Sequence, residues 1–288
     1  MYTGIPPGTW QSEYNTGIYV EIITVVVSSI SPHTIETFLM TSTDETGKVI
    51  VILFSTGDLG DVGRHAVAVA LEMAPSVVRT VRVISSNPTT LEHGNWNCGC
   101  SRHHITTTDR TRLEMNQADC STDNLAPFLE GVDAVISCLG NRLPFHPDIV
   151  AKLGTEQLIL AMHQWGCKRL VLLSSVGIGN DWPPMEGCRQ GDLLAGFFRT
   201  VCWSQYQDLK GAEQLVQHGT IASQLDYAIA RSVLTNESMP QGCYWVQQKK
   251  FVDRVGNEIS KMDLARFLVK EAIEPTLHRQ AVVVGGAL

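Results

Sequence analysis

Short apolar stretches alternate with longer helix-like segments along most of the chain. β-Branched apolar runs bounded by turn residues predict buried strands, and segments with apolar residues on one face predict helices. The expected strands are Lys48–Phe54, Thr80–Ser85, Ala134–Leu139, Arg169–Ser174, Asp226–Ala230 and Gln280–Val284. The expected helices are Arg64–Met73, Ala126–Glu130, Ile149–Trp165, Gln205–His218 and Lys261–Ile273.

This alternation predicts the α/β class. Parallel strands need crossover connections, and right-handed helical crossovers cover both faces of such a sheet. We therefore expect a doubly wound parallel sheet with helices on both faces. Ligands of these sheets bind at the carboxyl ends of the strands, near the point where the strand order reverses.

Residues 1–47 differ from the rest of the chain and are rich in Thr, Ser, Ile and Val. Tyr19–Ser28 and Thr34–Met40 each have strand-like composition and are separated by a turn at Ser31–His33. We expect a short N-terminal extension that is either β-rich or disordered. It carries no recognisable catalytic motif, and its role stays open.

The composition is that of a globular protein, with 44% hydrophobic and 18% charged residues among 288. The net charge of −7 and the lack of a basic cluster argue against a nucleic-acid partner. Scattered cysteines such as Cys138, Cys167 and Cys202 suggest buried, reduced thiols. No Lys or Arg precedes Lys48, and the apolar segment 18–30 is too short to span a bilayer. These features predict a soluble cytoplasmic protein without a membrane partner.

Three glycines follow the first expected strand at GxxGxxG spacing: Gly57, Gly60 and Gly63. In such a strand–turn–helix unit the first glycine allows a tight turn and the second admits a pyrophosphate close to the backbone. The third lets the helix pack closely on the strand, and the helix N-terminus offers free N–H groups to the phosphates. Glycines at this spacing also occur in ordinary turns, but the flanking strand and helix favour a bound dinucleotide.

Five segments in sequence order resemble the atypical short-chain dehydrogenase/reductase group of NmrA-like and flavin- or biliverdin-reductase-like NAD(P)-binding proteins. They are residues 56–65, 131–140, 168–177, 210–215 and 259–265. The resemblance implies a Rossmann-like domain over residues 48–288 with a small C-terminal substrate lobe. It is specific for fold and cofactor class but does not identify a substrate.

The resemblance also implies which residues contact the cofactor. The phosphate-binding loop comprises Gly57, Asp58, Leu59, Gly60, Asp61, Val62 and Gly63. Asp119 is placed beside the adenine, and Leu139, Gly140 and Ser174 line the cofactor site at the ends of later strands. Lys210 is placed to hydrogen-bond the nicotinamide ribose.

Two positions depart from the family pattern. Ser86, after the second strand, stands where relatives carry an arginine for the NADP 2′-phosphate or an acid for the NAD ribose. The lack of an acid favours NADP(H), with NAD as the alternative, and Arg102 is a second candidate for the phosphate. Asp58 and Asp61 put negative charge beside an anion site, which is tolerable if their side chains face outward.

Tyr206 and Lys210 form a YxxxK pair, and residues four apart share one face of a helix. A nearby ammonium favours the ionised phenol and makes the tyrosine a usable proton donor to a carbonyl. Ser175, or its neighbour Ser174, is expected to hydrogen-bond the same oxygen. Ser175, Tyr206 and Lys210 are therefore the catalytic candidates. The alternative is that Tyr206 is only a packing residue.

Two loop segments carry weaker signals. One contains the potential metal ligands His93, Cys98, Cys100, His103 and His104. Their spacing does not match common zinc sites, so we expect a polar insertion without metal. The other segment, Gly179–Gly196, contains Trp182 and Met185, which could line an apolar substrate pocket.

These observations favour an NAD(P)H-dependent oxidoreductase that transfers hydride to a small carbonyl, quinone or flavin-like acceptor. The alternative is a non-catalytic NAD(P)-binding regulator, redox sensor or assembly factor, in which the cofactor shifts a conformational equilibrium. An epimerase with tightly held NAD is less consistent with Ser86. Monomer and homodimer are both open.

Overall fold

The computed structural model describes residues 47–54, 58–88, 91, 97–98, 101–102, 110–140, 149–178, 202–242, 244–247 and 258–286. The helical elements are α2 (Asp58–Glu72), η2 (Ala126–Phe128), α5 (Val150–Trp165), α7 (Trp203–His218), η3 (Ile221–Gln224) and α8 (Lys261–Ile273). The strands are β1 (Lys48–Phe54), β2 (Val78–Ser85), β3 (Asn97–Cys98), β4 (Ser101–Arg102), β5 (Leu113–Gln117), β6 (Ala134–Cys138), β7 (Arg169–Ser175), β8 (Asp226–Ser232), β9 (Leu234–Asn236), β10 (Tyr244–Gln247), β11 (Glu258–Ser260) and β12 (Gln280–Gly286).

The main sheet has eight strands in the order β10-β12-β8-β7-β6-β1-β2-β5. All neighbouring strands pair in parallel except β10, which pairs antiparallel with β12. The chain moves from β1 to β2 on one side and later returns to β6 on the other side of β1. The strand order therefore reverses between β1 and β6, which is where such sheets bind ligands.

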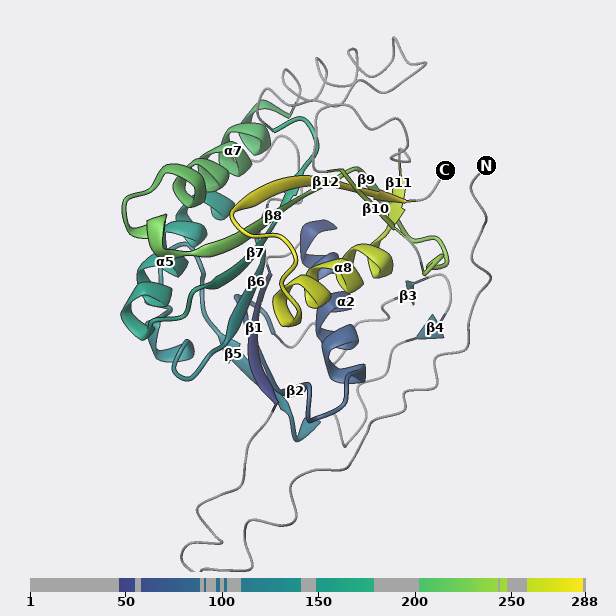
Figure 1. The fold of residues 1–288 in the computed structure, drawn as a ribbon, viewed down its shortest axis with the longest axis horizontal. Coiled ribbons are helices and arrows are strands. Elements are labelled where there is room, and N and C mark those ends of the chain that lie inside the picture. The colour runs from purple at the N-terminus through teal and green to yellow at the C-terminus, as the bar shows by residue number, and fades with distance from the viewer. Residues whose placement is uncertain are drawn as a thin grey trace, which may run out of the picture. The chain divides into compact units, whose positions relative to one another are not determined.

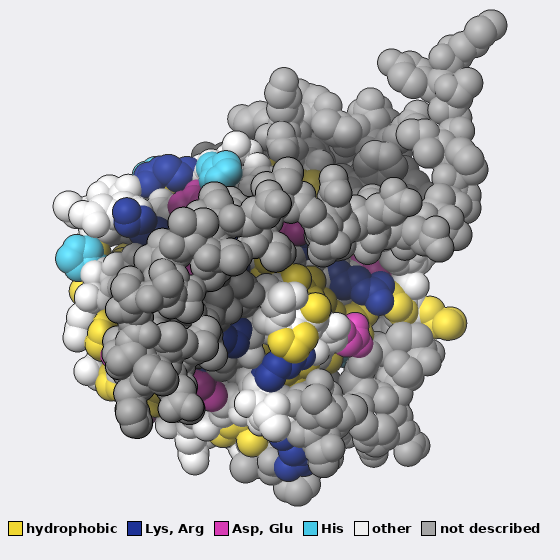
Figure 2. All heavy atoms as spheres, turned by 60° about the horizontal axis from the view of Figure 1, so that its bottom comes forward, with side chains coloured by type: hydrophobic (Ala, Val, Ile, Leu, Met, Phe, Trp, Pro, Cys, Tyr) yellow, Lys and Arg dark blue, Asp and Glu magenta, His cyan; other side chains and the backbone are white. Residues whose placement is uncertain are grey.

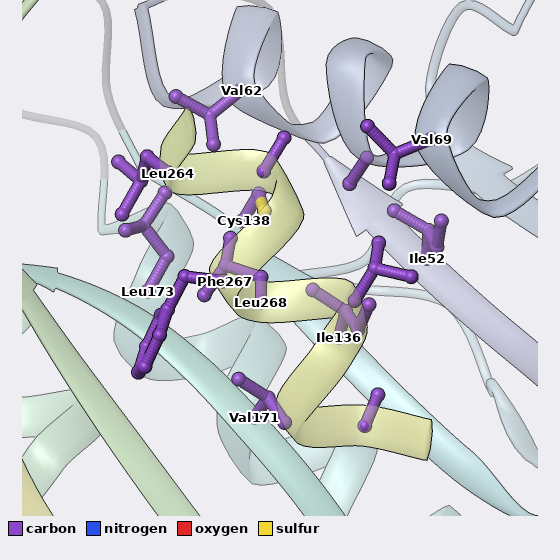
Figure 3. Close-up of a cluster of buried hydrophobic side chains, with 14 of the residues drawn as sticks. Ile52, Val62, Val69, Ile136, Cys138, Val171, Leu173, Leu264, Phe267 and Leu268 are labelled. Atoms are coloured by element: carbon purple, nitrogen blue, oxygen red, sulfur yellow. The ribbon is translucent and has the colours of Figure 1, made fainter. Parts of the chain in front are cut away.

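Helices cover both faces of this sheet (Figure 1). Alternate side chains of the central strands pack against α2 and α8, as Figure 3 shows for Ile52, Ile136 and Val171. The intervening side chains, such as Val135 and Leu172, pack against α5 and α7. The apolar strands are buried on both sides, as expected of a parallel sheet. The predicted doubly wound α/β fold is confirmed.

The element boundaries differ from the prediction at several points. Helix α2 begins at Asp58, although the glycines led us to expect a start at Arg64. The list of expected strands contains no residue range for strand β5 or for the antiparallel edge strand β10. The expected strands at 19–28 and 34–40 lie outside the described residues, so the N-terminal extension stays a prediction. In the part of the chain that the structure describes, no helix is long and apolar enough to cross a membrane.

The N-terminus of α5 is capped from a different helix. The residue before its first turn is Ile149, whose side chain accepts no hydrogen bond. Instead, the buried carboxylate of Asp208 on α7 accepts from the backbone N–H groups of Val150, Ala151 and Lys152, at 3.1, 2.9 and 2.7 Å. This contact satisfies three of the helix's free donors and ties the two helices together.

Replacing Asp208 with alanine is expected to lower the free energy of unfolding by about 2 kcal/mol, at the upper end of measured cap losses, because three N–H groups lose their acceptor. Asp208→Asn keeps one oxygen acceptor and should lose less. Urea unfolding followed by circular dichroism measures both. Equal stability of the alanine variant and the wild type would contradict the capping role.

Candidate functional site

The N-terminus of α2 follows the carboxyl end of β1, beside which the strand order reverses. Strand β1 ends at Phe54 and α2 starts at Asp58, so the helix N-terminus follows the strand almost directly. Gly57 lies outside the described residues. The first turn of α2 contains Asp58, Leu59 and Gly60, of which only the backbone is described. A helix N-terminus at this place presents free N–H groups to an anion, as a dinucleotide pyrophosphate requires.

Gly63 allows α2 to pack tightly on β1. A Cβ atom added there would lie 2.6 Å from the Cβ of Phe54, closer than Cβ atoms approach other atoms in proteins. Val62, the residue before it, is fully buried in the core beneath α2. The role predicted for the third glycine, close packing of helix on strand, is therefore confirmed. The residues of this turn fit a dinucleotide-binding unit.

Asp61 does not leave its negative charge free beside this turn. Its carboxylate accepts from Arg64 Nη1 at 2.7 Å and from Lys261 Nζ at 3.1 Å. The first partner lies one turn further along α2, and the second is the first residue of α8. The charge that departed from the family pattern is thus paired with two cations.

The ends of β2 and β5 place two further candidates at the same sheet edge. Ser86 follows β2 and is exposed, and its carbonyl accepts from the side-chain amide of Gln117 at 3.2 Å. Asp119 follows β5 and is also exposed. Its carboxylate accepts from the hydroxyl and the backbone N–H of Ser121, at 2.6 and 2.9 Å, and these bonds lower the pKa of Asp119. Adenine contacts of Asp119 stay a prediction.

Leu139 and Gly140 follow β6 and are both buried. The Leu139 side chain belongs to the core and leaves no room for a Cβ at Gly154, which would lie 2.4 Å from its Cδ1. The Leu139 side chain therefore packs in the core, and the cofactor contacts of Leu139 and Gly140 stay predictions.

The two serines at the end of β7 point to opposite faces of the sheet, as neighbouring strand residues do. The hydroxyl of Ser174 is buried and donates to Glu213 Oε1 at 2.6 Å. Arg231 Nη2 binds the other oxygen of Glu213 at 2.5 Å, so the three residues form one buried network. Ser175 is half-buried, and its hydroxyl donates to the Val176 carbonyl at 3.3 Å. Ser174 thus has a structural partner, whereas the hydrogen bond that Ser175 makes among the described residues is a weak local one.

Tyr206 and Lys210 lie together on α7, as their spacing predicted. The Lys210 Nζ is 5.7 Å from the centroid of the Tyr206 ring, in a cation–π arrangement. The ring also stacks on Trp203 at 5.9 Å and is only 6% exposed. Among the described residues, no hydrogen bond joins Ser175 to either side chain. The pair has been confirmed as neighbours, and its catalytic role stays a prediction.

Glu213 and Arg231 were not among the predicted site residues, although Glu213 binds Ser174 and Arg231 binds Glu213. The helical pattern of residues 209–216 did indicate a role for Glu213. Glu213 stands in a helical stripe with Leu209, Ala212 and Val216, all of which are buried. A carboxylate in such an apolar stripe requires a buried cationic partner.

Several sequence candidates are not described. His93, Cys100, His103 and His104 lie outside the described residues, as does the segment 179–196, and the side chains of Cys98 and Arg102 are not described. Within the described ranges, no group of three His, Cys, Asp or Glu side chains is placed to hold a metal. Burial of the cysteine thiols is confirmed for Cys120, Cys138, Cys167 and Cys202, and it raises the pKa of Cys120 to about 12.

The face drawn in Figure 2 carries its described Lys and Arg side chains in small separate groups. Acidic, polar and apolar side chains lie between them. On this face the described cations do not form one continuous basic surface.

Comparisons with known proteins agree with this geometry. The profile of the NAD(P)H-binding family matches residues 57–275. The structure is similar to a short-chain dehydrogenase/reductase from Veillonella parvula in complex with NADP, with 15% identity, a TM-score of 0.59, and coverage of 83% of this chain and 94% of that one. A putative NAD-dependent epimerase/dehydratase from Bacillus halodurans has 16% identity, a TM-score of 0.56 and coverage of 83% and 94%. The likeness to these structures shows the fold alone. Among curated protein sequences no match was found.

Proposed function

Because the chain belongs to the NAD(P)H-binding family, whose profile spans residues 57–275, we propose that it is an NAD(P)H-dependent oxidoreductase. Its acceptor is a small carbonyl, quinone or flavin-like molecule. The observation that carries the proposal is the start of α2 at the reversal of strand order, with Gly63 packed on Phe54. Such a turn offers backbone N–H groups to a dinucleotide pyrophosphate.

The catalytic part of the proposal rests on α7 and the end of β7. When bound, the reduced nicotinamide supplies a hydride. Tyr206 donates its phenolic proton to the acceptor oxygen, and the Lys210 ammonium, 5.7 Å from the ring centroid, stabilises the phenolate that remains. Ser175 orients the same oxygen through its hydroxyl.

NADP(H) is the proposed form of the cofactor. Ser86 is exposed directly after β2, at the position where related proteins contact the adenine ribose. Its hydroxyl is able to donate a hydrogen bond to a phosphate. An acid at this position would instead bind the two free ribose hydroxyls of NAD. Exposure of Ser86 and the absence of an acidic side chain there support the preference.

The proposal is tested by NADPH oxidation against a panel of carbonyls, quinones and flavins, followed by the absorbance of the reduced nicotinamide. Tyr206→Phe is expected to lower kcat for a carbonyl acceptor about a hundredfold, because the proton donor is lost, with little change in NADPH affinity. Tyr227→Phe is the matched control, since Tyr227 is buried in the same cluster but lies at the start of β8. Unchanged turnover of every accepted substrate by Tyr206→Phe would exclude the tyrosine as the acid.

A non-catalytic NAD(P)-binding regulator is the second candidate. The observation in its favour is that Tyr206 is 6% exposed within the core and that the Ser174 hydroxyl is already bound to Glu213. Such a protein would bind NADPH, as a fluorescence titration would show, but would not oxidise it with any acceptor of the panel.

A further inference from the structure

Helices α2 and α8 pack side by side on one face of the sheet (Figure 1). An ion pair between Lys261 and Asp61 joins their first turns. Lys261, the first residue of α8, has a side chain that is only 8% exposed. Its Nζ lies 3.1 Å from Asp61 Oδ2 and 3.3 Å from Glu237 Oε1. The ammonium therefore connects the first turn of α2 to the segment after β9.

Asp61 lies between the second and third glycines of the proposed phosphate-binding turn. A carboxylate at that place opposes the binding of a diphosphate, because two like charges within a Debye length repel each other. Arg64 Nη1 binds Asp61 Oδ1 at 2.7 Å, and Lys261 binds the other oxygen. Each carboxylate oxygen thus has its own cationic partner.

Lys261 stays protonated in this arrangement. Burial lowers the pKa of the amine, but hydrogen bonds and charge from Asp61 and Glu237 outweigh burial, so the pKa lies above its ordinary value. Asp61 and Glu237 are 31% and 64% exposed, so the buried ammonium is held from the solvent side by two acids. The amine carries its charge throughout the physiological pH range.

We propose that Lys261 is a positioning residue of the dinucleotide site, which neutralises Asp61 and so removes its repulsion of the cofactor pyrophosphate. This inference rests on the proposed NAD(P)H binding. Lys261 acts through Asp61 rather than by touching the cofactor. The C-terminal part of the chain, through α8, thereby sets the charge of a turn that lies two hundred residues earlier in the sequence.

The test is a fluorescence titration of four proteins with NADPH: wild type, Lys261→Met, Asp61→Asn and the double variant. Lys261→Met is expected to weaken binding about tenfold at low ionic strength and less at high ionic strength, since salt screens the partly exposed Asp61. Asp61→Asn should bind at least as tightly as wild type. In the double variant, removal of the repelling charge should restore affinity to within about threefold of wild type.

Two controls separate this role from a purely structural one. Lys270→Met removes the same charge from an exposed side chain in the last turn of α8 and should leave NADPH affinity unchanged. Thermal melting of each variant reports folding, and if Lys261→Met does not fold, Asp61→Asn alone decides the matter. Weaker binding by Asp61→Asn, or a double variant as weak as Lys261→Met, would overturn the inference. A wild type that binds no NADPH would overturn the proposed function instead.

Discussion

Replacing Glu213 with alanine is expected to lower the free energy of unfolding by about 3–5 kcal/mol. The change removes the Glu213 carboxylate from the buried Arg231 guanidinium. In the wild type the Arg231 Nη2 lies 2.5 Å from Glu213 Oε2. It also removes the acceptor of the Ser174 hydroxyl. Removing the carboxylate from a buried ion pair costs far more than the pair itself contributes to stability, so the loss exceeds that of an ordinary core change.

The measurement is thermal and urea unfolding of Glu213→Ala beside Glu114→Ala. Glu114 pairs with Arg82 at the same distance of 2.5 Å, but its side chain is 50% exposed. Water replaces that partner, so the control should lose less than about 1 kcal/mol. In a domain of this size the main variant should melt about 10 °C lower than wild type. Equal losses in the two variants would show that burial of the Glu213–Arg231 pair has no energetic consequence.

Gly63→Ala is expected to destabilise the fold by about 3 kcal/mol and to weaken NADPH binding strongly. The new methyl group would lie 2.6 Å from the Cβ of Phe54, an atom that cannot move without its backbone. Helix α2 must therefore shift away from β1, and its N-terminus, the proposed phosphate site, moves with it. Alanine is otherwise the better helix former, so any loss reports the clash alone.

Gly211→Ala is the matched control for this change. Gly211 is also helical, and an added Cβ would meet Lys152 Cδ at 2.7 Å, a flexible side chain that is free to move. We expect this variant to be at least as stable as wild type. If Gly63→Ala matched it in melting temperature and in NADPH titration, close packing of α2 on β1 would be irrelevant to the site.

The sequence predicted the central elements well because their patterns are strong. The β1 run at 48–54 and the α8 run at 261–273 match the structure at both ends. The start of α2 was misplaced because glycine propensity disfavours a helix, whereas packing on Phe54 requires glycine inside one. Strand β5 was missed because it is an edge strand whose Glu114 and Met115 are exposed, so it lacks a continuous apolar run.

The polar contacts of the site were much harder to predict. The YxxxK spacing brought Tyr206 and Lys210 together because both lie on one helix. Lys261, which binds Asp61, and the partners of Glu213 and Asp208 come from other elements, up to two hundred residues away. No local pattern encodes such pairing, because it depends on which helices meet after folding. The most that the sequence offered was the presence of a charge on an apolar face.

The central claim is that the turn after β1 binds NAD(P)H. It is tested most directly by titrating the purified protein with NADPH and with NADH and following fluorescence, since the six tryptophans allow energy transfer to the reduced nicotinamide. We predict saturable quenching by both, with tighter binding of NADPH. Absence of binding by either dinucleotide would contradict the claim and turn attention to protein partners.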